Sequence, residues 1–304
     1  MRARLQTIAL AVLLPLVAAM AAPSQTPPTA SPAPPAGGPA APMPSEGLRG
    51  WKRLTLKTEP SPLYTGSITL ELSEGTYAPA GRPAVILKTH AEARILGAIG
   101  LEERTTSWID AQTRRPLELF QMRPDDSARR FRYETGGIVQ TTWKPPEGRR
   151  GVPFEQWREL ETTTRRAALA DGTPLPEGAW VTDPYALVVL LPDQNSGNAS
   201  PGPWEFFLLQ RRQVVRLRVT PGERRSRTRE VVDESDGKSR SLSLMERRLD
   251  LAAEGEEGQN VRGLMGMQGA VEIWVDEISG APVEVRGTAP GVGPTAVSLV
   301  AFRR

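Results

Sequence analysis

Two stretches of the chain, SWIDAQTRRPLELF at residues 107–120 and IWVDEISGAPVEVR at residues 273–286, follow one pattern. Both read Trp, Ile or Val, Asp, two variable positions, Thr or Ser, two variable positions, Pro, and then a Glu between two Leu or two Val residues. The repeated Asp is either half of a pair of catalytic carboxylates or the corner of a repeated hairpin. The choice between these two interpretations decides the class of fold and of function.

Each feature of the repeat has a local structural reason. An Asp at the start of a turn accepts hydrogen bonds from backbone N–H groups two or three residues on, and Thr or Ser closes the turn. A Pro is tolerated at the start of the return strand. A catalytic pair would need both carboxylates to meet with raised pKa values, and nothing in the sequence brings them together. We therefore interpret as turn residues Asp110, Thr113, Pro116, Asp276, Ser279 and Pro282.

Alternation of apolar and polar residues continues from Trp51 onward and indicates strands. In GSITLELSE, Ile68, Leu70 and Leu72 share one face. Residues 129–143 read as two strands joined by Gly136-Gly137, which is a hairpin signal. Strands with one polar face indicate an antiparallel sheet that is exposed to solvent on one side. The sequence predicts a mainly β fold, a strongly curved antiparallel sheet or half-barrel, and the repeat suggests two related halves.

One segment, VTDPYALVVLLP at residues 181–192, breaks the alternation. Asp183 suits the N-cap of a helix, Pro184 its first position, and Pro192 a stop. We predict a short helix over residues 184–191. A buried strand is the rival interpretation, because Val188 and Val189 favour strands.

The N-terminus reads as an export signal. Arg2 and Arg4 precede an apolar run that ends in a small-x-small site, Ala19-Met20-Ala21. We expect a signal peptide over residues 1–21, cleavage after Ala21 and a periplasmic or secreted protein. The alternative is an uncleaved segment that anchors the chain in the inner membrane.

A Pro- and Ala-rich stretch follows, and such a composition cannot bury enough apolar surface to fold. We expect a disordered linker over residues 22–49 and a β-rich half-barrel domain over residues 50–304.

The composition excludes several kinds of site. The chain has no cysteine and one histidine, His90, so disulfides, thiolate sites and multi-histidine metal sites are excluded. Loss of Arg2 and Arg4 with the leader leaves 36 basic against 35 acidic side chains, which does not favour nucleic acid. We find neither a nucleophile elbow nor a phosphate loop. The sequence therefore predicts no enzyme, no cofactor and no metal site.

The repeated hairpin resembles one in periplasmic lipoprotein-carrier proteins and their relatives. The order of parts is similar to an uncharacterised bacterial envelope family of unknown function, with an exported leader, a first S-x-I-D-x-x-T-x-x-P hairpin, a central Asp-led helix and a C-terminal W-x-D…P-V hairpin. The resemblance rests on residues 107–116, 183–191 and 274–286 and covers the chain from about Leu63. It implies a half-barrel with an apolar concave side and no enzyme activity. The Pro-rich N-terminal segment and a polar insert over residues 193–201 depart from the family pattern.

A curved sheet with one apolar face must cover that face with a helix, with its own side chains or with a ligand. We predict a non-enzymatic envelope protein that binds a lipid or a lipoprotein acyl chain on the concave face. The alternative is a scaffold or protein-interaction module whose sheet is filled by its own side chains. The residues predicted to line the ligand site are Trp108, Trp143, Tyr185, Phe207, Met265, Met267 and Trp274.

The stretch from Arg211 to Arg229 holds eight arginines against Glu223. Arg216 and Arg218 share one face of an alternating strand. They are interpreted either as a solvated strand face or as residues attracted to an anionic membrane surface.

Overall fold

The computed structural model describes residues 48–59, 64–95, 99–123, 127–147, 152–169, 171–195, 203–210, 213–253, 262–264, 267–289 and 293–304. The chain divides into two units, Met1–Pro42 and Met43–Arg304, and the described residues all belong to the second. The predicted signal peptide, most of the predicted linker and Met265 lie outside the described residues. Leu48, assigned to the linker from the sequence, is fully buried in the core, so the folded part begins at or before it.

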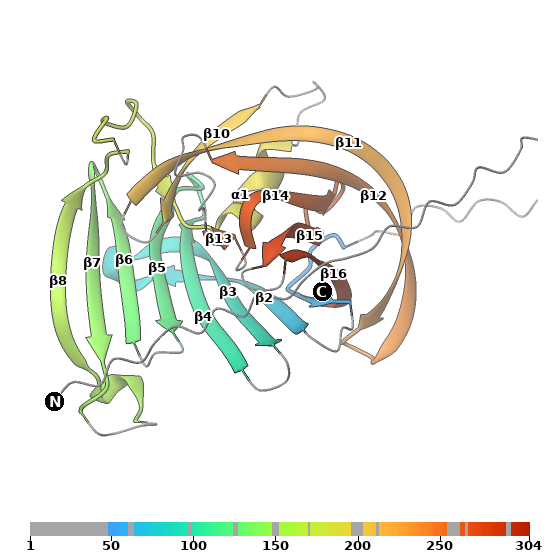
Figure 1. Ribbon diagram of the computed structural model, residues 1–304, viewed down its shortest axis with the longest axis horizontal. Coiled ribbons are helices and arrows are strands. Elements are labelled where there is room, and N and C mark those ends of the chain that lie inside the picture. Colours follow the sequence, from blue (N-terminus) through green and yellow to red (C-terminus); the bar gives the residue numbers. More distant parts are fainter. Residues whose placement is uncertain are drawn as a thin grey trace, which may run out of the picture. The chain divides into compact units, whose positions relative to one another are not determined.

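Strands make up most of the described chain, which confirms the predicted fold class (Figure 1). The first half contains β1 (Arg53–Thr58), β2 (Tyr64–Tyr77), β3 (Arg82–Ile95), β4 (Ile99–Asp110), β5 (Pro116–Arg123), β6 (Ser127–Glu134), β7 (Gly137–Lys144) and β8 (Arg158–Arg166), with 3-10 turns η1 (Ala78–Ala80) and η2 (Phe154–Gln156). The second half contains β9 (Val181–Thr182), α1 (Leu187–Asn195), β10 (Trp204–Gln210), β11 (Gln213–Asp233), β12 (Lys238–Ala253), β13 (Arg262–Leu264), β14 (Met267–Asp276), β15 (Pro282–Ala289) and β16 (Gly293–Arg303).

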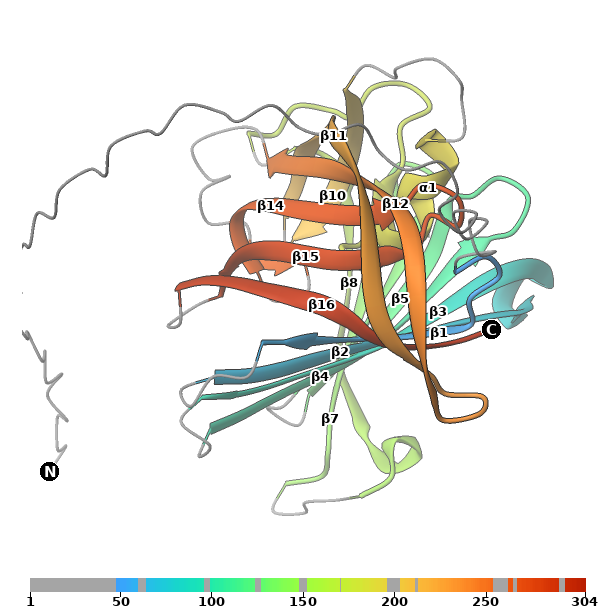
Figure 2. The same ribbon diagram turned by 90° about the vertical axis from the view of Figure 1, so that its right-hand side faces the viewer.

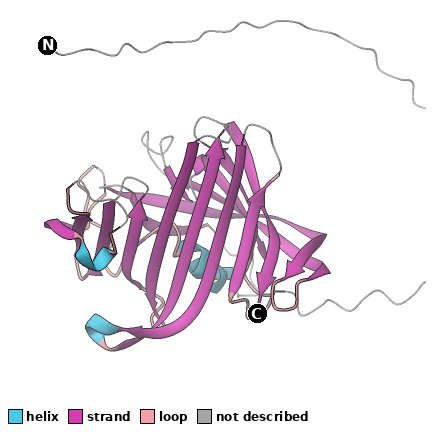
Figure 3. Ribbon diagram, turned by 90° about the horizontal axis from the view of Figure 1, so that it is seen from below, coloured by secondary structure: helices cyan, strands magenta, loops and turns pink. Residues whose placement is uncertain are grey.

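The strands form one sheet, in the order β8-β7-β6-β5-β4-β3-β2-β1-β16-β15-β14-β12-β11-β10-β9, with β13 beside β14. Neighbouring strands are antiparallel, except that β9 lies parallel to β10 and the end of β11 lies parallel to β16. Figure 3 shows the strands lying side by side across the sheet. The predicted antiparallel sheet is therefore confirmed, with two short parallel contacts that the sequence did not indicate.

A long hairpin of β11 and β12 crosses over β14, β15 and β16 (Figures 1 and 2). A register shift between Pro221 and Arg224 bends β11, as bulges do in antiparallel pairs. Near its end, β11 pairs with Ala301 and Phe302 of β16, whereas β15 pairs with the earlier part of that strand. The second half of the sheet thus curls back on itself, and we call this hairpin the arch.

The repeated sequence forms the same hairpin twice. In each copy the Asp N–H donates to the carbonyl five residues on, at 2.9 Å, and the Asp carbonyl accepts the N–H four residues on. The residue at that fourth position has a positive φ, 57° at Arg114 and 67° at Gly280. The register also shifts at the same place, after Trp108 and after Trp274. The two hairpins are therefore equivalent, and the turn interpretation is correct.

The predicted helix exists, but its bounds differ from the prediction. Asp183 caps the segment, because its Oδ1 accepts the backbone N–H groups of Tyr185 and Ala186, both at 2.9 Å. Residues 184–186 form a turn, and α1 runs from Leu187 to Asn195. Pro192 lies inside the helix and does not end it, although a proline in a helix interior removes a hydrogen-bond donor and crowds the carbonyl four residues earlier. Among the described residues, no helix has the length and apolarity to cross a membrane.

The interior is filled by the protein's own side chains. A continuous apolar cluster joins β1–β4, the segment 185–191 and the strands of the second half. A second cluster joins Leu119, Phe131 and Ile138 of the first half to Val181, Phe207, Leu209 and Val214. The interior face of the sheet is therefore covered by α1, by the arch and by packed side chains together.

Candidate functional site

Four of the predicted ligand residues belong to the core. Tyr185, Phe207, Met267 and Trp274 are all 7% exposed or less. Their side chains pack within the two apolar clusters. The alternation in the sequence identified them as apolar and inward-facing, and their side chains lie in the packed interior.

Trp108 and Trp143 point to the opposite face of the sheet. Ser107 reaches the interior, where its hydroxyl donates to Asp183 at 3.1 Å, and adjacent residues in a strand point to opposite faces. The ring centre of Trp108 instead lies 6.5 Å from the ring centre of Tyr77. The ring of Trp143 lies against the rings of Phe120 and Phe154. The predicted grouping of the tryptophans is thus corrected: Trp108 and Trp143 do not meet Trp274 in one site.

A pocket of about 470 Å³ lies where the first repeated turn meets the β6–β7 turn and the segment 174–181. Its apolar lining consists of Pro116, Leu117, Tyr133, Ala167, Pro174, Leu175, Pro176, Ala179, Trp180 and Val181. Its charged lining consists of Arg82, Arg115, Arg166, Asp110 and Glu134. The pocket therefore combines an apolar wall with a surplus of cationic side chains.

The arginines of this pocket are accessible to a ligand. Arg82, Arg115 and Arg166 are all exposed. Arg82 lies 3.8 Å from Asp110, and Arg115 and Arg166 form no ion pair with another described residue. Tyr133 has a buried hydroxyl without a hydrogen-bond partner among the described residues. An acidic group that entered the pocket would find charged donors without displacing an existing ion pair.

A second pocket of about 290 Å³ adjoins the first, because Ala179 and Trp180 line both. Its other lining residues are Trp204, Glu205, Phe206 and Phe207. Phe207, a member of the predicted ligand set, thus lines this pocket as well as the core. The rings of Trp180 and Phe206 lie 6.1 Å apart, edge to face.

Asp183 is a fully buried acid beside this region. Burial raises its pKa to about 6, although hydrogen bonds from Ala186, Ser107 and Tyr185 partly offset that rise. Its Oδ2 has no hydrogen-bond partner in the described part of the chain. Its capping of the segment before α1 and its contact with Ser107 give it a structural role, since they join that segment to β4.

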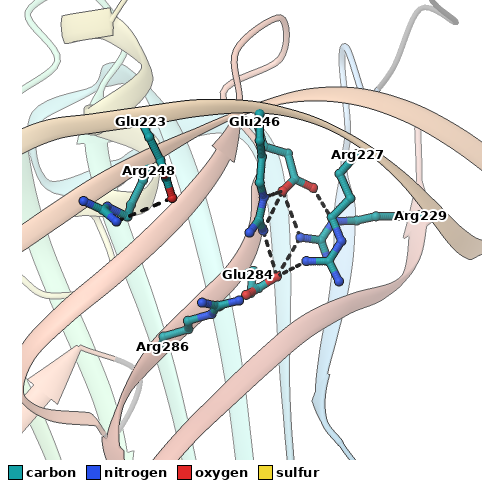
Figure 4. A network of polar contacts seen from close by, with 8 residues as sticks. Glu223, Arg227, Arg229, Glu246, Arg248, Glu284 and Arg286 are labelled. Carbon is teal, nitrogen blue, oxygen red and sulfur yellow. Dashed lines mark hydrogen bonds and ion pairs between the residues drawn. The ribbon is translucent and has the colours of Figure 1, made fainter. Parts of the chain in front are cut away.

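The arch carries a buried network of ion pairs (Figure 4). Arg225 and Arg229 each bind both Glu246 and Glu284, with Arg225 contacts of 2.8 and 3.1 Å. The guanidinium of Arg225 also stacks on Trp274, 3.5 Å from the ring centre. The two carboxylates are 0% and 2% exposed. Burial raises the pKa of Glu284, but Arg229 and Arg286 lower it more, so the net shift is downward.

This network was not predicted from the sequence. The arginine-rich stretch was interpreted as a solvated strand face or a membrane contact, whereas Arg229 is 7% exposed. No role was predicted for the repeated Glu, which is buried in both copies, as Glu118 and Glu284. The available signal was the period-two spacing of Arg225, Arg227 and Arg229, because the register of the arch sets Arg225 opposite Glu246.

Three further features of the sequence also have clear positions. His90 lies half-exposed on β3, 3.0 Å from Glu102 and 3.4 Å from Glu92, and Arg104 also holds Glu102. Arg218 is exposed on β11, and Arg216 is half-buried beside it. The 233–237 segment, DESDG, forms the turn of the arch, where Asp233 accepts the N–H of Ser235.

No family model matches the sequence, and no curated protein matches it. Among solved structures, the chain is similar to a beta-barrel-like protein of a domain of unknown function, DUF1849, from Brucella abortus. The identity is 12%, the TM-score is 0.48, and the match covers 82% of this chain and 94% of that one.

Proposed function

We propose that this protein is an exported, non-enzymatic binding protein that takes an amphiphilic ligand, a lipid or acyl chain with an acidic group, into the pocket of about 470 Å³. The observation that carries the proposal is the meeting of an apolar wall with the exposed guanidinium groups of Arg115 and Arg166. Ligand pockets are typically 300–1,000 Å³ and largely apolar, with a few polar groups that fix orientation.

The chemistry of the pocket supports this ligand class. An acyl chain gains about 0.8 kcal/mol for each methylene that leaves water, and the walls formed by Leu117, Leu175 and Val181 offer such a surface. Arg binds carboxylate and phosphate groups through charge-assisted hydrogen bonds. In this proposal the acidic end of the ligand lies against Arg115 and Arg166, and the protein works near an anionic membrane surface that attracts Arg216 and Arg218.

A second function is favoured by a different observation. The interior of the sheet is filled by its own side chains, as a scaffold or protein-interaction module requires. In that case the pocket would hold no small ligand, and the outer surface of the sheet would carry the function.

A displacement assay separates the two functions. Mature protein should enhance the fluorescence of an apolar dye, and oleate should displace the dye more strongly than methyl oleate, which lacks the charge. The double variant Arg115→Gln/Arg166→Gln should weaken oleate binding by about tenfold and leave methyl oleate binding unchanged. Arg158→Gln, an exposed arginine of the same strand as Arg166 but outside the pocket, is the matched control. Equal binding of both ligands by all proteins would contradict the role of the arginines, and no binding at all would support the scaffold.

A further inference from the structure

The ion-pair network of the arch contains four charged side chains whose net charge is zero. Arg225 and Arg229 bridge Glu246 and Glu284, so two positive and two negative charges balance each other in the interior. Ion pairs that are deeply buried are tolerated when charge and hydrogen bonds are satisfied on both sides. This inner quartet therefore needs no further charged group.

Two more arginines lie on the solvent side of the quartet. Arg227 Nη1 donates to Glu284 Oε2 at 2.9 Å, and Arg286 Nε donates to Glu284 Oε1 at 2.5 Å. Their side chains are 44% and 45% exposed, whereas Glu284 is buried (Figure 4). Because Glu284 is already matched by the inner quartet, Arg227 and Arg286 are surplus positive charge.

The two surplus guanidinium groups are held in place by one carboxylate. Each guanidinium has five N–H donors, and one donor of each is directed at Glu284. Glu272 is the acid opposite Arg286 in the strand register. No ion pair joins Glu272 to Arg286 within the described residues. Asp250 lies on the far side of Glu272 in the register and contacts Arg248 at 3.1 Å. Arg227, Arg286 and Glu272 together therefore still carry a net positive charge.

We propose that Arg227 and Arg286 form a binding site for a phosphate group on the outer side of the arch network. A planar guanidinium group can direct two parallel N–H donors at two oxygens of a phosphate group, which an ammonium group cannot do. Glu284 fixes both groups before the ligand arrives, which reduces the ordering cost of binding. None of these residues lines the pocket of the proposed function, so the two sites are tested separately.

The phosphate can belong to free inorganic phosphate or to a phospholipid head group, and two measurements distinguish these sources. Calorimetric titration with inorganic phosphate at low salt measures the first. Sedimentation with phosphatidylcholine vesicles, with and without phosphatidylglycerol, measures the second. Binding in either assay supports the site when the double variant described below weakens it, and such binding in the vesicle assay alone identifies a lipid head group as the ligand.

The variants locate the binding. Arg227→Gln/Arg286→Gln should weaken binding by about tenfold or more. Arg240→Gln is the matched control, because Arg240 lies on the same arch and its side chain is 46% exposed, but it pairs with Asp233 and Asp236. Glu272→Gln should strengthen binding, since it removes a negative charge that lies opposite Arg286 in the strand register while leaving the quartet intact. The proposal is overturned if wild-type protein binds neither probe, or if the double variant and Arg240→Gln bind like wild type.

Discussion

At the scale of single residues, the two equivalent Asp side chains serve the same turn in different surroundings. Asp110 accepts backbone N–H groups of Thr113 and Gln112, and these bonds lower its pKa. Asp276 is bound to Ser279 in the same way, but burial raises its pKa. The turn chemistry was predictable from the sequence because it acts within a few residues. The difference in burial was not, because the arch covers Asp276 and comes from elsewhere in the chain.

The buried carboxyl of Asp183 gives a prediction about pH. The folded protein keeps this proton up to a pH of about 6, whereas an unfolded chain releases it at about 4. Between these values the folded state binds more protons, so the free energy of unfolding falls as the pH rises. Asp183→Asn lacks this loss and keeps an oxygen that can cap the segment before α1.

The measurement is urea unfolding of wild type and Asp183→Asn at pH 4 and at pH 7. The free energy of unfolding of the variant, relative to wild type, should rise on the order of 2 kcal/mol between the two pH values. Other titrating groups contribute equally to both proteins and cancel in the difference. If the difference in free energy of unfolding between the two proteins were the same at both pH values, the pKa of Asp183 would not be raised in the folded state.

At the scale of elements, prediction from the sequence succeeded where the pattern was local and failed where it depended on distant pairing. Alternation places Ser107 and Trp108 on opposite sides of their strand, but the prediction that Trp108 faces the concave interior was wrong. The interior side is set by Asp183, which binds Ser107 from far along the chain. The buried role of Arg229 likewise depends on β12 and β15, which supply Glu246 and Glu284.

The repeated Glu offers a matched pair of variants at this scale. Glu284 is held by several arginines of the arch and its own strand. Glu118 occupies the same place in the first hairpin but contacts Tyr77 at 3.0 Å and Arg130 at 3.3 Å. Glu284→Gln should destabilise the fold by about 3–5 kcal/mol, because it leaves Arg229 buried with half of its countercharge. Glu118→Gln should cost about 1–2 kcal/mol, because its charged partner is partly exposed.

Thermal or urea unfolding of the two variants tests this difference. Equal costs for the two substitutions would mean that the network does not hold the arch to β14 and β15. A larger cost for Glu118→Gln would reverse the assignment of the stronger contact to the second hairpin.

At the scale of the whole described fold, the interior face of the single sheet is covered by other segments of the same chain. The arch covers the second half, the segment 185–191 fills the centre, and two apolar clusters run through the interior. The curved sheet was predictable from the alternation of apolar and polar residues in its strands. That its apolar face must be covered was also predictable, because the sequence indicates only one short helix. The arch was not predicted, because its curvature comes from a register shift and its end pairs with the last strand.

In the proposed function, a ligand enters the pocket beside the first repeated turn and not the interior of the sheet. Photo-crosslinking measures this most directly, with a fatty acid that carries a diazirine near the end of its chain, followed by peptide mass mapping. We expect crosslinks to the apolar wall, at Leu117, Tyr133, Leu175 or Trp180, and competition by unlabelled oleate. Specific crosslinks at Met267 or Trp274 in the core, or at Trp143 on the outer face, would contradict it.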